Sequence, residues 1–239
     1  MSFSSLRAVA FAAVLTAPAW AGAAEYQVAA VADGGTIKGK VIYKGTVPMR
    51  TVLPTKDKET CGGPRKEAMV IVGPGGEVKE AVVHLKEVAK GKDWDKKGAK
   101  KPEINNVKCI FEPHVQVVGA GNIDIVNSDP VLHNTHGYYG KTTAFNVALP
   151  IQGGRVSKPL RRAGAVRVDC DAHGWMEGWV YVVDNPYYAQ TGDDGSFTIA
   201  NVPPGQYTLV AWQEHVGTME IPVTVKAKAT AEVPIELKK

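Results

Sequence analysis

The sequence predicts an all-β protein made of two β-sandwiches. Short stretches in which polar and apolar residues alternate recur along most of the chain, and this period of two is typical of half-buried strands. Clusters of Gly, Pro, Asn and Asp lie between these stretches, and such clusters favour turns. The 239 residues are enough for two small domains.

The first residues are expected to form a secretory signal peptide over residues 1–23. Arg7 gives a short positive start, an apolar run follows from Ala8 to Ala19, and Ala21-Gly22-Ala23 offers a small-residue cleavage site. The apolar run is too short to span a membrane comfortably. We therefore expect a mature chain without a membrane span that is periplasmic or otherwise extracytoplasmic.

The first strand-rich block begins at Thr36. The segment Thr36–Tyr43 alternates for most of its length, and Ala68–Val72 and Val78–Leu85 continue the pattern around the turn sequence Gly73-Pro74-Gly75-Gly76. A lysine-rich stretch, Lys86–Lys101, follows without convincing periodicity. We expect a solvated connecting loop there, and the alternative is a basic patch that steers an acidic partner.

A second strand-rich block runs from Val107 to Val183, and a third follows Asn185-Pro186. In the third block, Asp193-Asp194-Gly195 predicts a hairpin turn, and Phe197-x-Ile199 and Pro203-Pro204-Gly205-x-Tyr207 come after it. This pattern resembles the carboxypeptidase regulatory-like family of small β-sandwiches. The resemblance implies that residues 35–100 and 186–239 form one discontinuous sandwich, with a domain at 104–184 inserted between them. The alternative is three small units in series.

Net charge gives little information about partners. The chain has 28 Lys and Arg against 24 Asp and Glu, which gives a formal charge of +4. This mild excess does not argue for binding to nucleic acid.

The most informative residues are Cys170, His173 and Met176. Two residues separate each neighbouring pair, so one tight loop can present three donors to a single ion. A histidine upstream, His133 or His136, would complete a set of one thiolate, two imidazoles and a thioether, which is the ligand set of a blue-copper electron-transfer centre. Residues three apart in an extended chain point to opposite faces, so only one of these two histidines should reach the ion.

The remaining cysteines are Cys61 and Cys109. The chain has three cysteines in total, and an oxidising compartment favours joining the two that do not belong to the ligand loop. We expect a disulfide between them.

The second block also resembles the blue-copper cupredoxins, of which amicyanin and plastocyanin are examples. The resemblance implies a Greek-key sandwich that binds one copper ion at a mononuclear type 1 site, with His133, Cys170 and His173 as strong ligands and Met176 as the weak axial ligand. The residues that carry it are Phe111-x-Pro113, Gly121, Asn127, His133-Asn134 and Cys170-x2-His173-x2-Met176.

Neighbours of the ligands receive roles from the same resemblance. Asn134 is expected to support the ligand loop by hydrogen bonding. The position after the ligand cysteine is commonly Ser or Thr in the family, and here it is Asp171, whose carboxylate near the thiolate would favour Cu(II). Gly174 and Trp175 are expected to form an apolar collar around His173. An imidazole edge exposed inside this collar would be the natural exit for an electron.

The residues favour an electron carrier over an enzyme. The six histidines form no His-x-His pair of the kind that a multicopper oxidase cluster needs, and the ligand loop has one cysteine where a dinuclear copper centre needs two. Haem-attachment and zinc-protease motifs are also missing. We expect a periplasmic carrier that exchanges single electrons with a redox protein such as a c-type cytochrome or a periplasmic oxidoreductase. The alternatives are a periplasmic copper-binding chaperone and an extracellular binding module, and zinc could also occupy the site.

Overall fold

The computed structural model describes residues 26–95 and 101–239. Within these ranges nearly all regular structure is β, and the helix α1 (Lys58–Cys61) is a single turn. The predicted all-β fold class is therefore confirmed. The expected signal peptide lies outside the described residues, and so does part of the lysine-rich stretch. Across the described ranges, no helix is long and apolar enough to cross a membrane.

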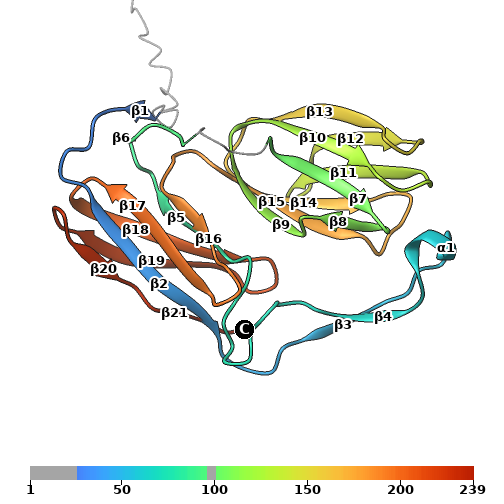
Figure 1. Cartoon of the computed structure of the whole chain (residues 1–239), viewed down its shortest axis with the longest axis horizontal. Helices are drawn as coiled ribbons and strands as arrows, with labels where there is room; N and C mark the ends of the chain where they lie inside the picture. Colours follow the sequence, from blue (N-terminus) through green and yellow to red (C-terminus); the bar gives the residue numbers. More distant parts are fainter. Residues whose placement is uncertain (1–25, 96–100) are drawn as a thin grey trace, which may run out of the picture.

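The first sandwich combines strands from both ends of the described chain (Figure 1). One sheet has the order β16-β5-β18-β19, and the facing sheet contains β17, β2, β20 and β21. Because β5 pairs with β16 on one side and with β18 on the other, this sandwich is discontinuous in sequence. Its strands are β2 (Gly35–Tyr43), β5 (Val82–Lys86), β16 (Tyr188–Gln190), β17 (Ser196–Val202), β18 (Gly205–Gln213), β19 (Gly217–Val225), β20 (Thr230–Glu232) and β21 (Ile235–Leu237).

Alternation of side chains explains how these strands bury one face. Ile37, Val41 and Tyr43 of β2 point inward, and they pack in one cluster with Leu85 of β5 and Leu209 of β18. Complete burial of one such aliphatic side chain contributes roughly 1.5–3 kcal/mol. The inward set of β2 therefore fixes which face of the strand meets the opposite sheet.

The second sandwich is inserted between β5 and β16. A four-stranded sheet of order β13-β10-β7-β8 faces a five-stranded sheet of order β12-β11-β14-β15-β9. Phe111, Ile123, Val166 and Val180 lie in the buried cluster between them. Its strands are β7 (Glu103–Val107), β8 (Ile110–Glu112), β9 (Val115–Gly119), β10 (Gly121–Asn127), β11 (His133–Tyr139), β12 (Thr142–Leu149), β13 (Arg155–Leu160), β14 (Gly164–Cys170) and β15 (Glu177–Val183).

The two sandwiches share a small apolar contact. Val82 and Trp212 of the first sandwich pack against Tyr181 and Val183 of the second. His84 Nε2 and the Tyr181 hydroxyl are 3.0 Å apart and add a polar contact beside this cluster. A short parallel pair, β1 (Gln27–Val28) with β6 (Lys90–Gly91), lies beside the first sandwich (Figure 1).

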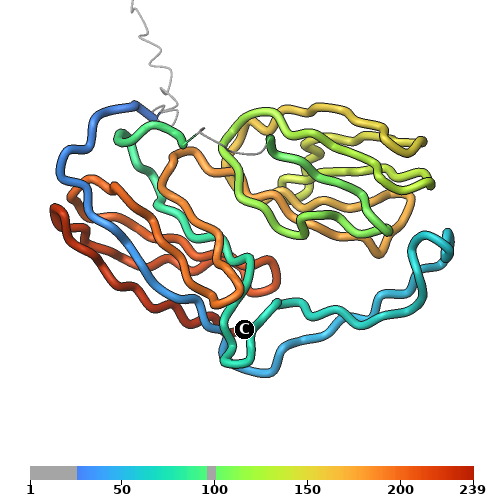
Figure 2. The backbone as a smooth tube through the Cα atoms, in the orientation of Figure 1, coloured from blue at the N-terminus to red at the C-terminus, as the bar shows by residue number. Residues whose placement is uncertain are grey.

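A long excursion between β2 and β5 leaves the first sandwich and reaches the second (Figure 2). Strands β3 (Met49–Val52) and β4 (Arg65–Ala68) pair antiparallel, and α1 lies between them. We call residues 49–68 the arm. No sequence pattern predicted it, because its two strands are only four residues long and neither alternates polar and apolar residues.

The strands expected around Gly73-Pro74-Gly75-Gly76 are shorter than predicted. Only Ala68 of the first of them belongs to a strand, and Val72 forms an isolated bridge with Val78 across the turn. The turn itself is present, with the Gly73 N–H donating to the Glu77 carbonyl at 2.8 Å.

Candidate metal centre

Two neighbouring strand ends bring the candidate ligands together. Strand β11 begins at His133, β14 ends at Cys170, and the antiparallel register places Thr135 opposite Cys170. Side chains alternate along a strand, so His133 shares the buried face with Thr135 and Cys170, whereas His136 belongs to the opposite face. The register thus decides which histidine faces the cysteine.

The loop after Cys170 folds back on itself. The His173 N–H donates to the Cys170 carbonyl at 3.1 Å, and the Met176 N–H donates to the His173 carbonyl at 2.9 Å. These two successive turns return His173 to the side of Cys170 before β15 begins at Glu177. The two-residue spacing seen in the sequence is therefore the spacing of two tight turns.

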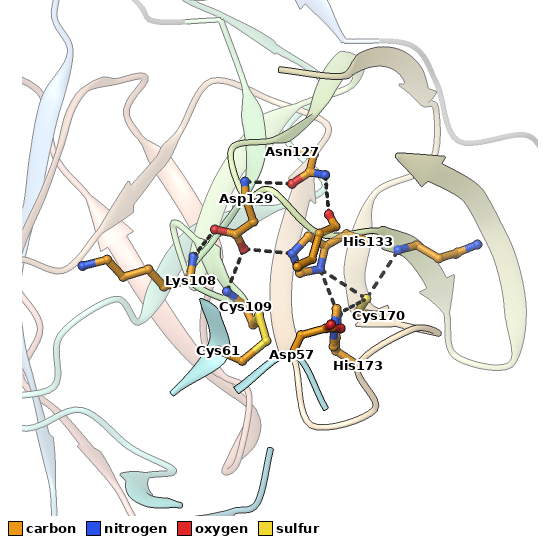
Figure 3. The surroundings of a disulfide bond; sticks show 11 residues. Asp57, Cys61, Lys108, Cys109, Asn127, Asp129, His133, Cys170 and His173 are labelled. Carbon is orange, nitrogen blue, oxygen red and sulfur yellow. Dashed lines mark hydrogen bonds and ion pairs between the residues drawn. A yellow bond between two sulfur atoms is a disulfide. The ribbon is translucent and has the colours of Figure 1, made fainter. Parts of the chain in front are cut away.

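Three donor atoms converge at this point (Figure 3). Cys170 Sγ lies 3.7 Å from His133 Nδ1 and 3.7 Å from His173 Nδ1, and the two Nδ1 atoms are 3.1 Å apart. The three residues are buried, with exposed fractions of 1% for Cys170 and 0% for each histidine. Metal–ligand bonds of roughly 2.0–2.3 Å hold donors about 3–4 Å apart, so these separations fit one shared ion.

Met176 is buried beside these residues. It belongs to the same apolar cluster as Cys170 and is only 3% exposed. Its thioether would be the weak axial donor of the predicted ligand set.

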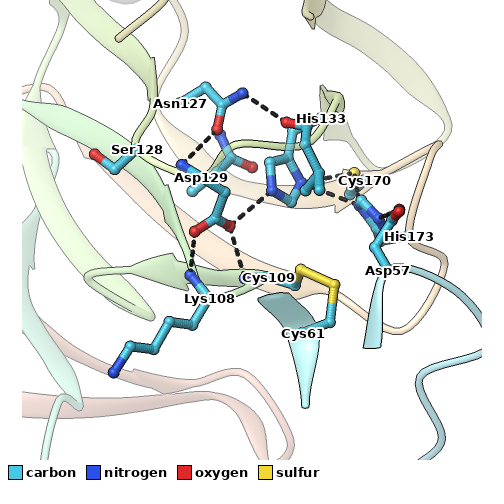
Figure 4. Close-up of polar contacts among 12 residues, drawn as sticks. Asp57, Cys61, Lys108, Cys109, Asn127, Ser128, Asp129, His133, Cys170 and His173 are labelled. Carbon is cyan, nitrogen blue, oxygen red and sulfur yellow. Dashed lines mark hydrogen bonds and ion pairs between the residues drawn. A yellow bond between two sulfur atoms is a disulfide. The ribbon is translucent and has the colours of Figure 1, made fainter. Parts of the chain in front are cut away.

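Asp129 holds the far side of the His133 ring. The His133 Nε2–H donates to Asp129 Oδ2 at 2.8 Å, and the same carboxylate accepts the backbone N–H groups of Lys108 at 2.6 Å and Cys109 at 2.8 Å (Figure 4). Burial lowers the pKa of His133, which favours the neutral ring, and a neutral ring that donates through Nε2 presents its Nδ1 lone pair to the other donors. We did not predict Asp129 as a site residue, because a spacing of four residues outside a helix does not place two side chains together.

Asp57 holds the far side of the His173 ring in the same way. The His173 Nε2–H donates to Asp57 Oδ2 at 2.8 Å, and Asp57 comes from the arm. Carboxylates on the outer nitrogen of a ligand histidine fix its tautomer and orientation. Sequence reasoning missed Asp57, because the two residues are 116 positions apart and no motif links them.

The disulfide expected between Cys61 and Cys109 is present beside the centre. Their Cα atoms are 4.9 Å apart, and both residues are buried. Cys61 is the last residue of α1 in the arm, and Cys109 follows β7 in the second sandwich. The bond therefore ties the arm to the sandwich that carries the candidate ligands.

The Cys170 thiol lies in a buried environment that disfavours its ionised form. Burial raises the pKa of Cys170, while hydrogen bonds from the backbone N–H groups of Asn134, His173 and Ala172 oppose the rise. A metal ion would compensate the buried thiolate charge, so its binding releases a proton. The donor set and its burial fit a copper ion in this respect.

His136 and Asp171 lie together on the other face of the sheet. His136 Nδ1 is 3.0 Å from Asp171 Oδ2, and His136 Nε2 is 3.0 Å from the Thr143 hydroxyl. The Asp171 carboxylate is thus bound to His136 on the other face of the sheet, and its charge adds to burial in raising the pKa of Cys170.

Asn134 supports the site through its backbone. Its N–H donates to Cys170 Sγ at 3.4 Å, and its carbonyl accepts the Asp171 N–H at 3.0 Å. The side-chain Oδ1 of Asn134 is buried without a partner. The expected support by hydrogen bonding exists, but the amide side chain does not supply these bonds.

The collar expected around His173 is only partly formed by the loop. The Trp175 ring lies 5.0 Å from the His173 ring, measured between centroids. The outer edge of the imidazole is not open to solvent, because Asp57 of the arm covers it and His173 is fully buried. An exposed imidazole edge is therefore not a feature of this site.

Comparisons of sequence give a limited result. The family model described as polysaccharide lyase family 4, domain II, matches residues 171–233. That segment runs from the candidate ligand loop through most of the C-terminal strands of the first sandwich. No curated protein matches the chain.

Comparisons of structure return copper proteins that match about a third of the chain. A purple cupredoxin from Nitrosopumilus maritimus is 21% identical with a TM-score of 0.31, covering 35% of this chain and 100% of its own. Amicyanin from Paracoccus versutus is 19% identical with a TM-score of 0.32, covering 36% and 83%. A copper-containing nitrite reductase from Thermus scotoductus is 20% identical with a TM-score of 0.31, covering 36% and 24%.

Proposed function

We propose that this chain is a type 1 copper protein that carries single electrons outside the cytoplasm. The observation that supports this most is the convergence of His133 Nδ1, His173 Nδ1 and Cys170 Sγ within 3.7 Å of one another in a buried site. One thiolate, two imidazoles and a nearby thioether are the donors of a blue-copper centre. Bound copper would supply one-electron chemistry by alternating between Cu(I) and Cu(II).

The chain's own residues would keep the donors in place in both oxidation states. His133 and Cys170 are at the ends of paired strands, and Asp129 and Asp57 hold the outer nitrogens of the two rings. Such a site leaves little room for a substrate, which favours electron transfer over catalysis. The partner would be another redox protein, such as a c-type cytochrome or a periplasmic oxidoreductase.

The absorption and electron-paramagnetic-resonance spectra of the copper-loaded protein test this proposal. We expect an intense blue thiolate-to-copper band that is lost in Cys170→Ser and in His133→Ala. The matched control is His136→Ala, which should stay blue because this ring faces Asp171 and Thr143. A blue band that survives in Cys170→Ser would refute the ligand assignment.

A second candidate function is delivery of copper to an acceptor protein. The sulfur atoms of Cys61 and Cys109 and a ring nitrogen of His173 lie within 4.8 Å of one another, so reduction of the disulfide would place two thiols beside the centre. Thiolates bind Cu(I) well. Transfer of Cu(I) to a chelator should then become faster after reduction in the wild type and stay unchanged in Cys61→Ala/Cys109→Ala. An unchanged rate in the wild type would count against delivery.

A further inference from the structure

The arm is fixed over the candidate ligand loop at several points (Figures 3 and 4). The chain enters the arm from the first sandwich and returns to it, yet the arm makes three close contacts with the second sandwich. One of these contacts involves a candidate ligand, and another involves the residue that follows Met176. The contacts are Asp57 Oδ2 to His173 Nε2 at 2.8 Å, Arg50 Nη1 to Glu177 Oε2 at 2.8 Å, and the Cys61–Cys109 disulfide.

Asp57 has an unusual local conformation for its position. It is the N-cap of α1, where an aspartate side chain normally accepts a hydrogen bond from the first turn of the helix. Here the side chain makes no such bond, and the backbone is left-handed with φ 49° and ψ 39°. Aspartate is one of the few residues other than glycine that adopt this region readily. The Asp57 carboxylate is instead directed at His173.

We propose that Asp57 is a positioning residue of the metal centre, supplied by the arm to hold His173 and to close the outer edge of its ring. This inference rests on the proposed copper function. The carboxylate keeps the proton of His173 on Nε2, so the Nδ1 lone pair stays available to the ion. Its negative charge beside a ligand ring also stabilises the more positive oxidised metal.

Closure of this edge determines where the centre can be approached. A partner cannot touch the His173 ring while Asp57 covers it. A hollow of about 440 Å³ beside the arm reaches the centre from another side, and its lining includes Arg50, Cys170, Trp175 and Met176. An approach to the centre on the side of Cys170 and Met176 therefore does not pass the outer edge of the His173 ring.

The test compares three variants of the full chain. Asp57→Ala removes both the hydrogen bond and the charge, Asp57→Asn removes the charge but keeps an acceptor oxygen, and Glu59→Gln is the matched control. Glu59 is exposed in the same helix, so its substitution changes net charge by the same amount without touching His173. Asp57 is itself 38% exposed on its side chain, so none of the three changes disturbs a core.

The first measurement does not require metal. In the copper-free protein, nitrogen-15 spectra of the imidazoles should show a protected Nε2–H proton on His173. This signal should persist in Asp57→Asn and in Glu59→Gln and disappear in Asp57→Ala. Equal signals in all the variants would overturn the proposed role of Asp57, whether or not the protein binds copper.

The second measurement is the affinity for Cu(II) and Cu(I) alone, by competition with chelators. Asp57→Ala should lose roughly 10–100-fold in Cu(II) affinity, as is typical when an outer partner of a ligand histidine is removed. The loss of Cu(I) affinity should be smaller. Each tenfold difference between the Cu(II) loss and the Cu(I) loss raises the reduction potential by about 59 mV. Asp57→Asn should raise the potential in the same direction, and Glu59→Gln should leave it unchanged. If Asp57→Ala and Glu59→Gln have equal reduction potentials, the inference about Asp57 is wrong. If the wild-type protein does not bind copper at all, only the proposed function is refuted.

Discussion

Removing the disulfide should cost the protein a large share of its stability. Cys61 and Cys109 are separated by 48 residues, so the bond closes a long loop in the unfolded chain. The chain-entropy relation gives about 4 kcal/mol of stabilisation for a loop of this size. The double variant Cys61→Ala/Cys109→Ala should lose this stabilisation completely, because alanine leaves no buried polar group behind.

Urea unfolding followed by tryptophan fluorescence measures this loss. With a slope of about 2 kcal/mol per molar urea, the transition midpoint should fall by roughly 2 M. Adding a reductant to the wild type should lower the midpoint similarly, and adding it to the double variant should have no effect. If the double variant unfolds at the same urea concentration as the wild type, non-covalent contacts alone hold the arm and the reasoning is refuted.

Three further predictions concern single side chains. Asp129→Ala should destabilise the protein by about 2–4 kcal/mol in urea unfolding, because two backbone N–H groups and the His133 ring lose their common acceptor; a change near zero would contradict this. Asp171→Ser should raise the reduction potential of the copper form by less than Asp57→Asn does, since the Asp171 carboxylate is bound to His136, whereas the Asp57 carboxylate is bound to the candidate ligand His173; voltammetry of both variants decides the order. Burial lowers the pKa of His84, so the unfolded chain takes up this proton at a higher pH than the folded chain does. The neutral His84 ring contributes its full share of the free energy of unfolding above about pH 6.5, and this share is lost as the pH falls below that value. His84→Gln should therefore make the stability of the metal-free protein less sensitive to acid. Thermal unfolding at two pH values measures the difference.

The parts of the fold and site that could be predicted are those encoded locally. Alternation along Thr36–Tyr43 predicted β2 within one residue, and the spacing from Cys170 to Met176 predicted a tight loop because each turn depends only on neighbouring residues. Sequence alone left His133 and His136 as competing candidates. The antiparallel register of β11 and β14, which depends on long-range pairing, places His133 on the face of Cys170.

The arm could not be predicted because nothing in its own sequence specifies where it lies. Its strands are only four residues long and largely exposed, so they carry no apolar period that would indicate a partner surface. Asp57 gains its place from a disulfide and an ion pair to a sandwich that comes later in the chain. Contacts of this kind leave no pattern around residue 57.

The position of β5 between β16 and β18 also constrains how the protein is made. During synthesis from the N-terminus, β2 and β5 emerge early, but the strands that complete their sheets are translated only after the whole inserted sandwich. The inserted sandwich can close with its own strands as soon as β15 is synthesised. The first sandwich can close only after its C-terminal strands are synthesised. The inserted sandwich therefore closes before the first sandwich, although β2 and β5 of the first sandwich are synthesised earlier. Truncation near the C-terminus should leave the first sandwich open while the inserted sandwich remains folded.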